Sequence, residues 1–105
     1  MSTNNQNQDN PQSLMQRAAE ARINQQWPQA EALYREMAQV LTIAGNNAEL
    51  AVVLYHLAKT LESQGKYFAS FETLSALDLL LIELEEQNDK DFLEQLRQEQ
   101  DDEVA

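Results

Sequence analysis

The chain has 105 residues, no cysteine, one histidine and a formal net charge of −11. This length allows one small domain, and the acidic balance argues against a surface that binds nucleic acid or an anionic membrane. Without cysteine the chain cannot form disulfides, thiolate metal sites or a cysteine nucleophile. With a single imidazole and acidic side chains on polar helix faces, we expect neither an enzyme nor a bound metal or cofactor.

The N-terminal residues 1–12 are polar and rich in Asn and Gln, which predicts a disordered leader. They have neither the basic start nor the apolar core of a signal peptide. The longest apolar stretches, Leu50–Tyr55 and Leu79–Ile82, are much shorter than the roughly 20 residues of a membrane span. We therefore expect no membrane association and a cytosolic location.

Apolar residues at helical spacing predict five helices, over residues 13–24, 28–43, 48–63, 66–86 and 89–100. Ser13, Asn47 and Asn88 are the expected N-caps of the first, third and fifth helices. Gly45 and Gly65 are expected to end the second and third helices. No segment alternates as a strand does, so the predicted fold class is all-α.

Negative charge is concentrated at the C-terminal end. Residues 82–105 contain ten acidic residues against Lys90 and Arg97. This pattern is typical of a solvated helix face followed by a frayed acidic tail, here residues 101–105. The fifth helix is expected to cap the domain with three apolar side chains, Phe92, Leu93 and Leu96.

The sequence repeats itself at an offset of 40 residues, which predicts two similar helical hairpins over residues 12–41 and 51–81. Ala18 and Ala58 are the small residues that allow close helix approach. The paired positions include Leu14 with Leu54, Gln25 with Gly65, Trp27 with Tyr67, Ala30 with Ser70, Tyr34 with Leu74, and Met37 with Leu77.

The second unit resembles the tetratricopeptide repeat family. Its first helix matches that family's pattern, as does the turn with Gly65 and Tyr67; the matching helix positions are Leu54, Leu57, Ala58, Leu61, Ser70, Leu74 and Leu77. The first unit departs from the pattern at Arg17 and Gln25. The long period resembles the variant found in kinesin light chains. The resemblance implies a short α-solenoid of two hairpins plus a capping helix, within residues 13–100.

The resemblance also implies a concave groove lined by the first helix of each unit, which would hold a partner peptide or amphipathic helix. Carried over by position, the groove residues are Met15, Ala19, Arg22, Val52, Tyr55, His56, Lys59 and Glu62. A histidine placed as His56 is more often an ordinary helix-surface residue than a residue that binds a partner.

The fourth helix has apolar residues pointing in nearly all directions, which a short acidic cap cannot fully cover. We expect the surplus to form a homodimer or partner interface, with full internal burial as the alternative. The residues concerned are Leu77, Leu79, Leu80, Leu81 and Ile82.

These features predict a small protein–protein interaction module, such as an adaptor or a chaperone in assembly. The alternative is an acidic decoy or inhibitor whose C-terminal helix occupies a basic surface of a target. A purely structural oligomerisation unit is a third hypothesis. The sequence does not identify the partner.

Overall fold

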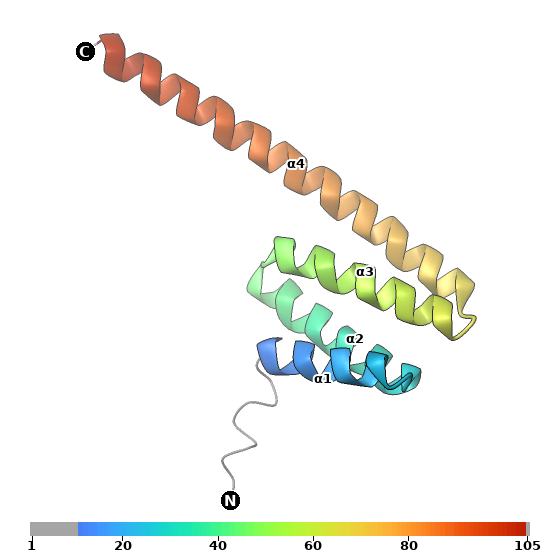
Figure 1. Ribbon diagram of the computed structural model, residues 1–105. Helices are drawn as coiled ribbons and strands as arrows, with labels where there is room; N and C mark the ends of the chain where they lie inside the picture. The colour runs from blue at the N-terminus through green and yellow to red at the C-terminus, as the bar shows by residue number, and fades with distance from the viewer. Residues whose placement is uncertain (1–10, 105) are drawn as a thin grey trace, which may run out of the picture.

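A computed structural model describes residues 11–104 of the chain, and this stretch is helical apart from three short turns. Within it there is no strand, so the predicted all-α fold class is confirmed. Successive helices pack against each other, α1 on α2, α2 on α3 and α3 on α4 (Figure 1). The helices are α1 (Pro11–Ile23), α2 (Trp27–Ala44), α3 (Asn47–Ser63) and α4 (Tyr67–Val104).

Two of the three turns between helices contain a glycine, at the positions that the sequence predicts. Gly45 and Gly65 have φ angles of +73° and +75°, in the left-handed region that glycine adopts without steric cost. Gln25 occupies the equivalent turn after α1 with φ of +59°. The two hairpins therefore share one turn geometry, although only the second has glycine at the critical position.

Two of the predicted N-caps, Asn47 and Ser13, are wrong. Asn46, not Asn47, caps α3, and its Oδ1 accepts a hydrogen bond from the backbone N–H of Glu49 at 3.3 Å. Ser13 lies inside α1, which begins at Pro11. Residues 1–10 of the predicted leader lie outside the described residues.

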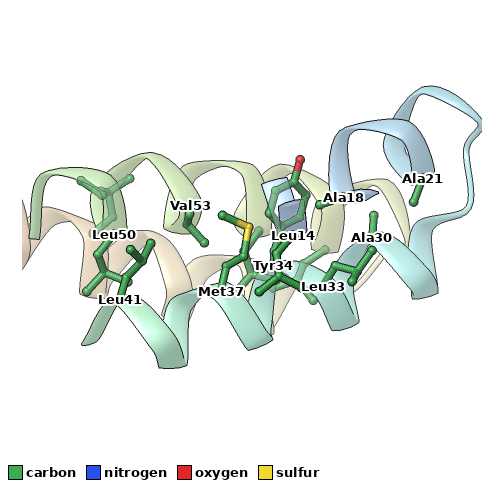
Figure 2. Packing of buried hydrophobic residues seen from close by; sticks show 14 of the residues in the cluster. Leu14, Ala18, Ala21, Ala30, Leu33, Tyr34, Met37, Leu41, Leu50 and Val53 are labelled. Atoms are coloured by element: carbon green, nitrogen blue, oxygen red, sulfur yellow. The ribbon is translucent and has the colours of Figure 1, made fainter. Parts of the chain in front are cut away.

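A single apolar core joins the helices (Figure 2). Small residues allow close packing within each hairpin, since Ala18 and Ala58 are completely or almost completely buried. In the second hairpin Ser70 Oγ donates a hydrogen bond to the carbonyl oxygen of Ala58 at 2.9 Å. Tyr34, Leu14, Met37 and Leu61 are among the largest fully buried side chains.

The predicted capping helix over residues 89–100 is wrong. One continuous helix, α4, includes Asn88 and extends through the predicted acidic tail as far as Val104. Neither Gly nor Pro interrupts this stretch, and an Asn in a helix interior costs only about 0.6 kcal/mol relative to Ala. Starting a new helix after a turn would require a second, unfavourable nucleation. The helix therefore continues instead of folding back.

As a result α4 projects well beyond the end of α3 (Figure 1), and the molecule has principal dimensions of 60 × 41 × 21 Å. Among the helices of residues 11–104, none is apolar over a length sufficient to cross a bilayer.

Candidate interaction surfaces

The internal repeat identifies which side of α4 lacks a neighbour. One face of α2, the second helix of the first hairpin, packs against α3. Near its start, Glu31 contacts Lys66 and Gln64 beyond the end of α3. One turn later the ring of Tyr34 stacks on His56, with the ring centroids 5.6 Å apart.

The same face of α2 continues through Ala38 and Leu41. Ala38 shares a hollow with Leu50 and Leu54 of α3. Leu41 is buried in the core. Positions 31, 34, 38 and 41 thus form the side of α2 on which α3, running in the opposite direction, is packed.

An offset of 40 residues places four α4 residues at the positions of this α2 face: Phe71, Leu74, Asp78 and Leu81. All four are exposed. The clearest contrast is between Tyr34, which is 0% exposed, and its counterpart Leu74, which is 40% exposed. The side of α4 that corresponds to the α3-binding side of α2 is therefore exposed within the described part of the chain.

The same face continues along the projecting part of α4. Steps of three or four residues keep positions on one side of a helix. We call this surface the outer face of α4; it consists of Tyr67, Phe71, Leu74, Asp78, Leu81, Glu85, Asp89, Phe92 and Leu96. Ile82 and Leu93 flank it and are also exposed.

The outer face has an ordered pattern of apolar and acidic residues. Its first part is mainly aromatic and aliphatic, Glu85 and Asp89 follow, and Phe92 and Leu96 form a second apolar group. Every side chain between Glu85 and Glu99 is exposed. Phe92, Leu93 and Leu96 were expected to cap the core, but they lie on a helix that leads away from it.

The predicted leucine interface is wrong for two of its five residues. Leu77 and Leu80 are each only 8% exposed and belong to the core, because they lie on the side of α4 that packs against α3. Leu79, Leu81 and Ile82 are 64%, 47% and 51% exposed. Only these three are accessible to a partner.

Leu79 lies apart from the outer face, at an apolar hollow between α2, α3 and α4. The hollow has a volume of about 620 Å³. Ile43, at the end of α2, is strongly exposed beside it. The lining consists of Ala38, Gln39, Thr42, Ile43, Leu50, Leu54, Ala76, Leu79, Leu80 and Glu83.

Three of the eight predicted groove residues are brought together by Tyr34 of α2. Arg22 Nε donates a hydrogen bond to the Tyr34 hydroxyl at 3.3 Å. His56 stacks on the Tyr34 ring and meets Tyr55 edge-on, with the latter ring centroids 5.7 Å apart. Burial and the nearby charge of Arg22 lower the pKa of His56, so its imidazole is neutral at pH 7. Such a group can accept or donate a hydrogen bond, but it carries no charge.

The other predicted groove residues have simpler surroundings. Lys59 Nζ forms an ion pair with Glu62 at 3.1 Å, and this hydrogen bond raises the pKa of Lys59. Val52 is exposed, whereas Met15 and Ala19 are half-buried. That these residues bind a partner stays a prediction. Tyr34, which organises the cluster, was expected only as a core residue, since its contact with His56 depends on how α2 and α3 pack.

Within the described residues, no group of three or more His, Asp and Glu side chains could hold a metal ion. Searches against protein-family models, curated proteins and solved structures found no match.

Proposed function

We propose that this protein is a protein–protein interaction module whose outer face of α4 binds a helix of a partner protein. The observation that carries the proposal is the contrast between the two hairpins. The face of α2 that includes Tyr34 is covered by α3, and the equivalent face of α4 that includes Leu74 is exposed. A partner helix lying on α4 as α3 lies on α2 would bury that surface.

The exposed aromatic side chains of the outer face support this function. Aromatic side chains contribute strongly to binding when they become buried in an interface. Tyr67, Phe71 and Phe92 on the outer face are all exposed. Soluble monomeric proteins rarely leave large apolar surfaces exposed, so surfaces of this kind mark interaction sites. Adaptor and assembly-chaperone roles, which the tetratricopeptide resemblance implies, both use such a module.

Site-directed cross-linking in extracts of the native cell tests the proposal. The chain lacks cysteine, so Ser75→Cys, at an exposed position beside the outer face, provides a single attachment point for a photoreactive group. We expect a partner adduct that decreases at least tenfold when Phe71→Ser is added, because a buried aromatic anchor is lost. Ile23→Ser, which removes an exposed apolar side chain of α1, is the matched control and should leave the adduct unchanged.

An equal yield of the same adduct from Gln29→Cys on α2, or an adduct insensitive to Phe71→Ser, would contradict the proposed surface. Both positions used for attachment are exposed. Far-UV circular dichroism of each variant checks that the helices are retained.

An acidic decoy is a second candidate function, and the continuous α4 is the observation that favours it. Of the net charge of −11, all but −1 belongs to α4, which has twelve acidic residues against Lys90 and Arg97. Deletion of residues 87–105 separates the two functions. An interaction module keeps its partner with reduced affinity, whereas a decoy loses both its binding and the salt dependence of that binding.

A further inference from the structure

We propose that the partner is a basic amphipathic helix that is apolar toward both ends and carries Lys or Arg in its central turns. This inference rests on the proposed function, because it specifies the chemistry of the helix that the outer face of α4 binds. It is argued from the order of charged and apolar residues along that face.

The acidic residues of the outer face lie within its apolar surface. Asp78 lies between Leu74 and Leu81, and Glu85 and Asp89 follow before Phe92. All three acidic side chains are exposed. A wholly apolar partner helix would remove these carboxylates from water without giving them a partner, which is costly. A partner with cations opposite them would satisfy them.

A second copy of this chain does not meet that requirement. If two α4 helices paired in parallel, each acidic residue of the face would lie opposite itself. If they paired antiparallel about the centre of the face, Asp78 would lie opposite Glu85. Like charges placed together in an interface disfavour that pairing. The charge pattern therefore selects a different chain.

The length of the face sets the length of the partner segment. From Phe71 to Leu96 the outer face extends over about 38 Å at the rise of an α-helix. A partner helix of about 26 residues matches this distance. By analogy with α2 and α3, it would run antiparallel to α4. Its apolar ends would cover Phe71 and Phe92. Its central cations would lie beside Asp78, Glu85 and Asp89.

Two synthetic peptides of about 26 residues test the proposal. Both have leucines on one face toward each end; one has lysines at the central positions of that face, and the other has glutamines there. Binding to the full chain is measured by fluorescence anisotropy at several salt concentrations. We expect the lysine peptide to bind at least tenfold more tightly, with an affinity that decreases as salt increases.

Two double variants of the protein locate the charge effect. Glu85→Gln with Asp89→Asn removes two charges from the outer face and should weaken binding of the lysine peptide about tenfold. Asp91→Asn with Glu94→Gln removes two charges from the opposite side of α4, where both residues are exposed. This control should change the affinity for the lysine peptide by less than about threefold, because it alters only the net charge of the protein.

Equal affinities for the two peptides, or equal effects of the two double variants, would overturn the proposal and leave the proposed function intact. Failure of both peptides to bind, together with a Phe71-dependent cross-link in cell extracts, would also overturn the partner chemistry alone. Loss of the cross-link would instead overturn the proposed function. Self-association of the unmodified chain through α4 would assign the surface to a second copy and contradict the proposal.

Discussion

The carboxylate of Glu31 on α2 accepts a hydrogen bond from Nζ of Lys66, 2.9 Å away in the turn before α4. The same carboxylate accepts hydrogen bonds from Gln64 at 2.8 Å and from Arg35 at 2.9 Å. Burial raises the pKa of Glu31, but these hydrogen bonds and the charge of Lys66 outweigh it and lower the pKa from 4.5 to about 2. Glu31 thus joins the first hairpin to the turn of the second.

Glu31→Gln should lower the free energy of unfolding by about 1–2 kcal/mol at pH 7. Since the pKa in the folded state lies below the ordinary value, ionised Glu31 stabilises the fold above pH 4.5. That contribution is lost as the pH falls from 4.5 to about 2. The free energies of unfolding of the natural chain and of Glu31→Gln are measured with urea at pH 7 and at about pH 3. They should differ less at the lower pH.

Glu36→Gln is the matched control, because it removes an exposed carboxylate from the same helix. It should change stability by less than about 0.5 kcal/mol at either pH. A constant difference between Glu31→Gln and the natural chain at both pH values would mean that the contribution is not due to ionised Glu31.

The first turn offers a stabilising substitution. Gln25 has φ of +59°, a conformation that costs a residue with a side chain about 1–2 kcal/mol. Gln25→Gly removes that cost but adds backbone entropy to the unfolded chain, so the net gain should be about 0.5–1 kcal/mol. Gln26→Gly, at φ of −90°, should be destabilising. Thermal unfolding of both variants measures the contrast, and a lower Tm for Gln25→Gly would contradict it.

The close approach of α3 and α4 depends on the small side chain of Ala58, which is 1% exposed. Ala58→Leu should destabilise the protein by about 1–3 kcal/mol, because the added atoms separate the two helices. The substitution would also lengthen the hydrogen bond from Ser70 Oγ to the Ala58 carbonyl oxygen. Ala32→Leu, an exposed helical control, should be nearly neutral in the same urea titration.

The hairpin architecture could be predicted from the sequence because it depends on local features. Glycines at the turns, Pro28 in the first turn of α2 and the 3–4 spacing of apolar residues all act within a few residues of the chain. The continuity of α4 does not follow from the cap preference of Asn88, because the cost of nucleating another helix outweighs that preference. The burial of Leu77 and Leu80 cannot be predicted from composition, because composition does not show which side of a helix faces its neighbour.

The candidate surface could be predicted only in part, for a related reason. The surplus of leucines on the fourth helix is visible in the sequence, and the repeat relates Leu74 to Tyr34. That Tyr34 is buried against His56 depends on the packing of α2 on α3, which the structure provides. Only then does the exposure of Leu74 point to the face of α4 that we propose binds a partner helix.

The projecting part of α4 should be much less stable than its first half. Residues 85–99 have exposed side chains only, with local support from a 3.1 Å hydrogen bond between Gln87 and Asp91 and a 3.9 Å ion pair between Glu94 and Arg97. An unpacked helix of this length is marginal in water. Amide hydrogen exchange should therefore be fast after about residue 86 and slow over residues 70–84. Equal protection of both parts would show that another contact stabilises the projection.

The acidic residues of the outer face should also keep this chain from pairing with itself. Without them, two exposed apolar faces containing Phe71 and Leu81 could pack together, and the interface would no longer juxtapose like charges. Glu85→Gln with Asp89→Asn should therefore strengthen self-association at least tenfold, measured by analytical ultracentrifugation. Asp91→Asn with Glu94→Gln changes the net charge by the same amount, and this variant should self-associate no more than the natural chain. If both variants associate alike, overall charge repulsion, and not the pattern on this face, keeps the chains apart.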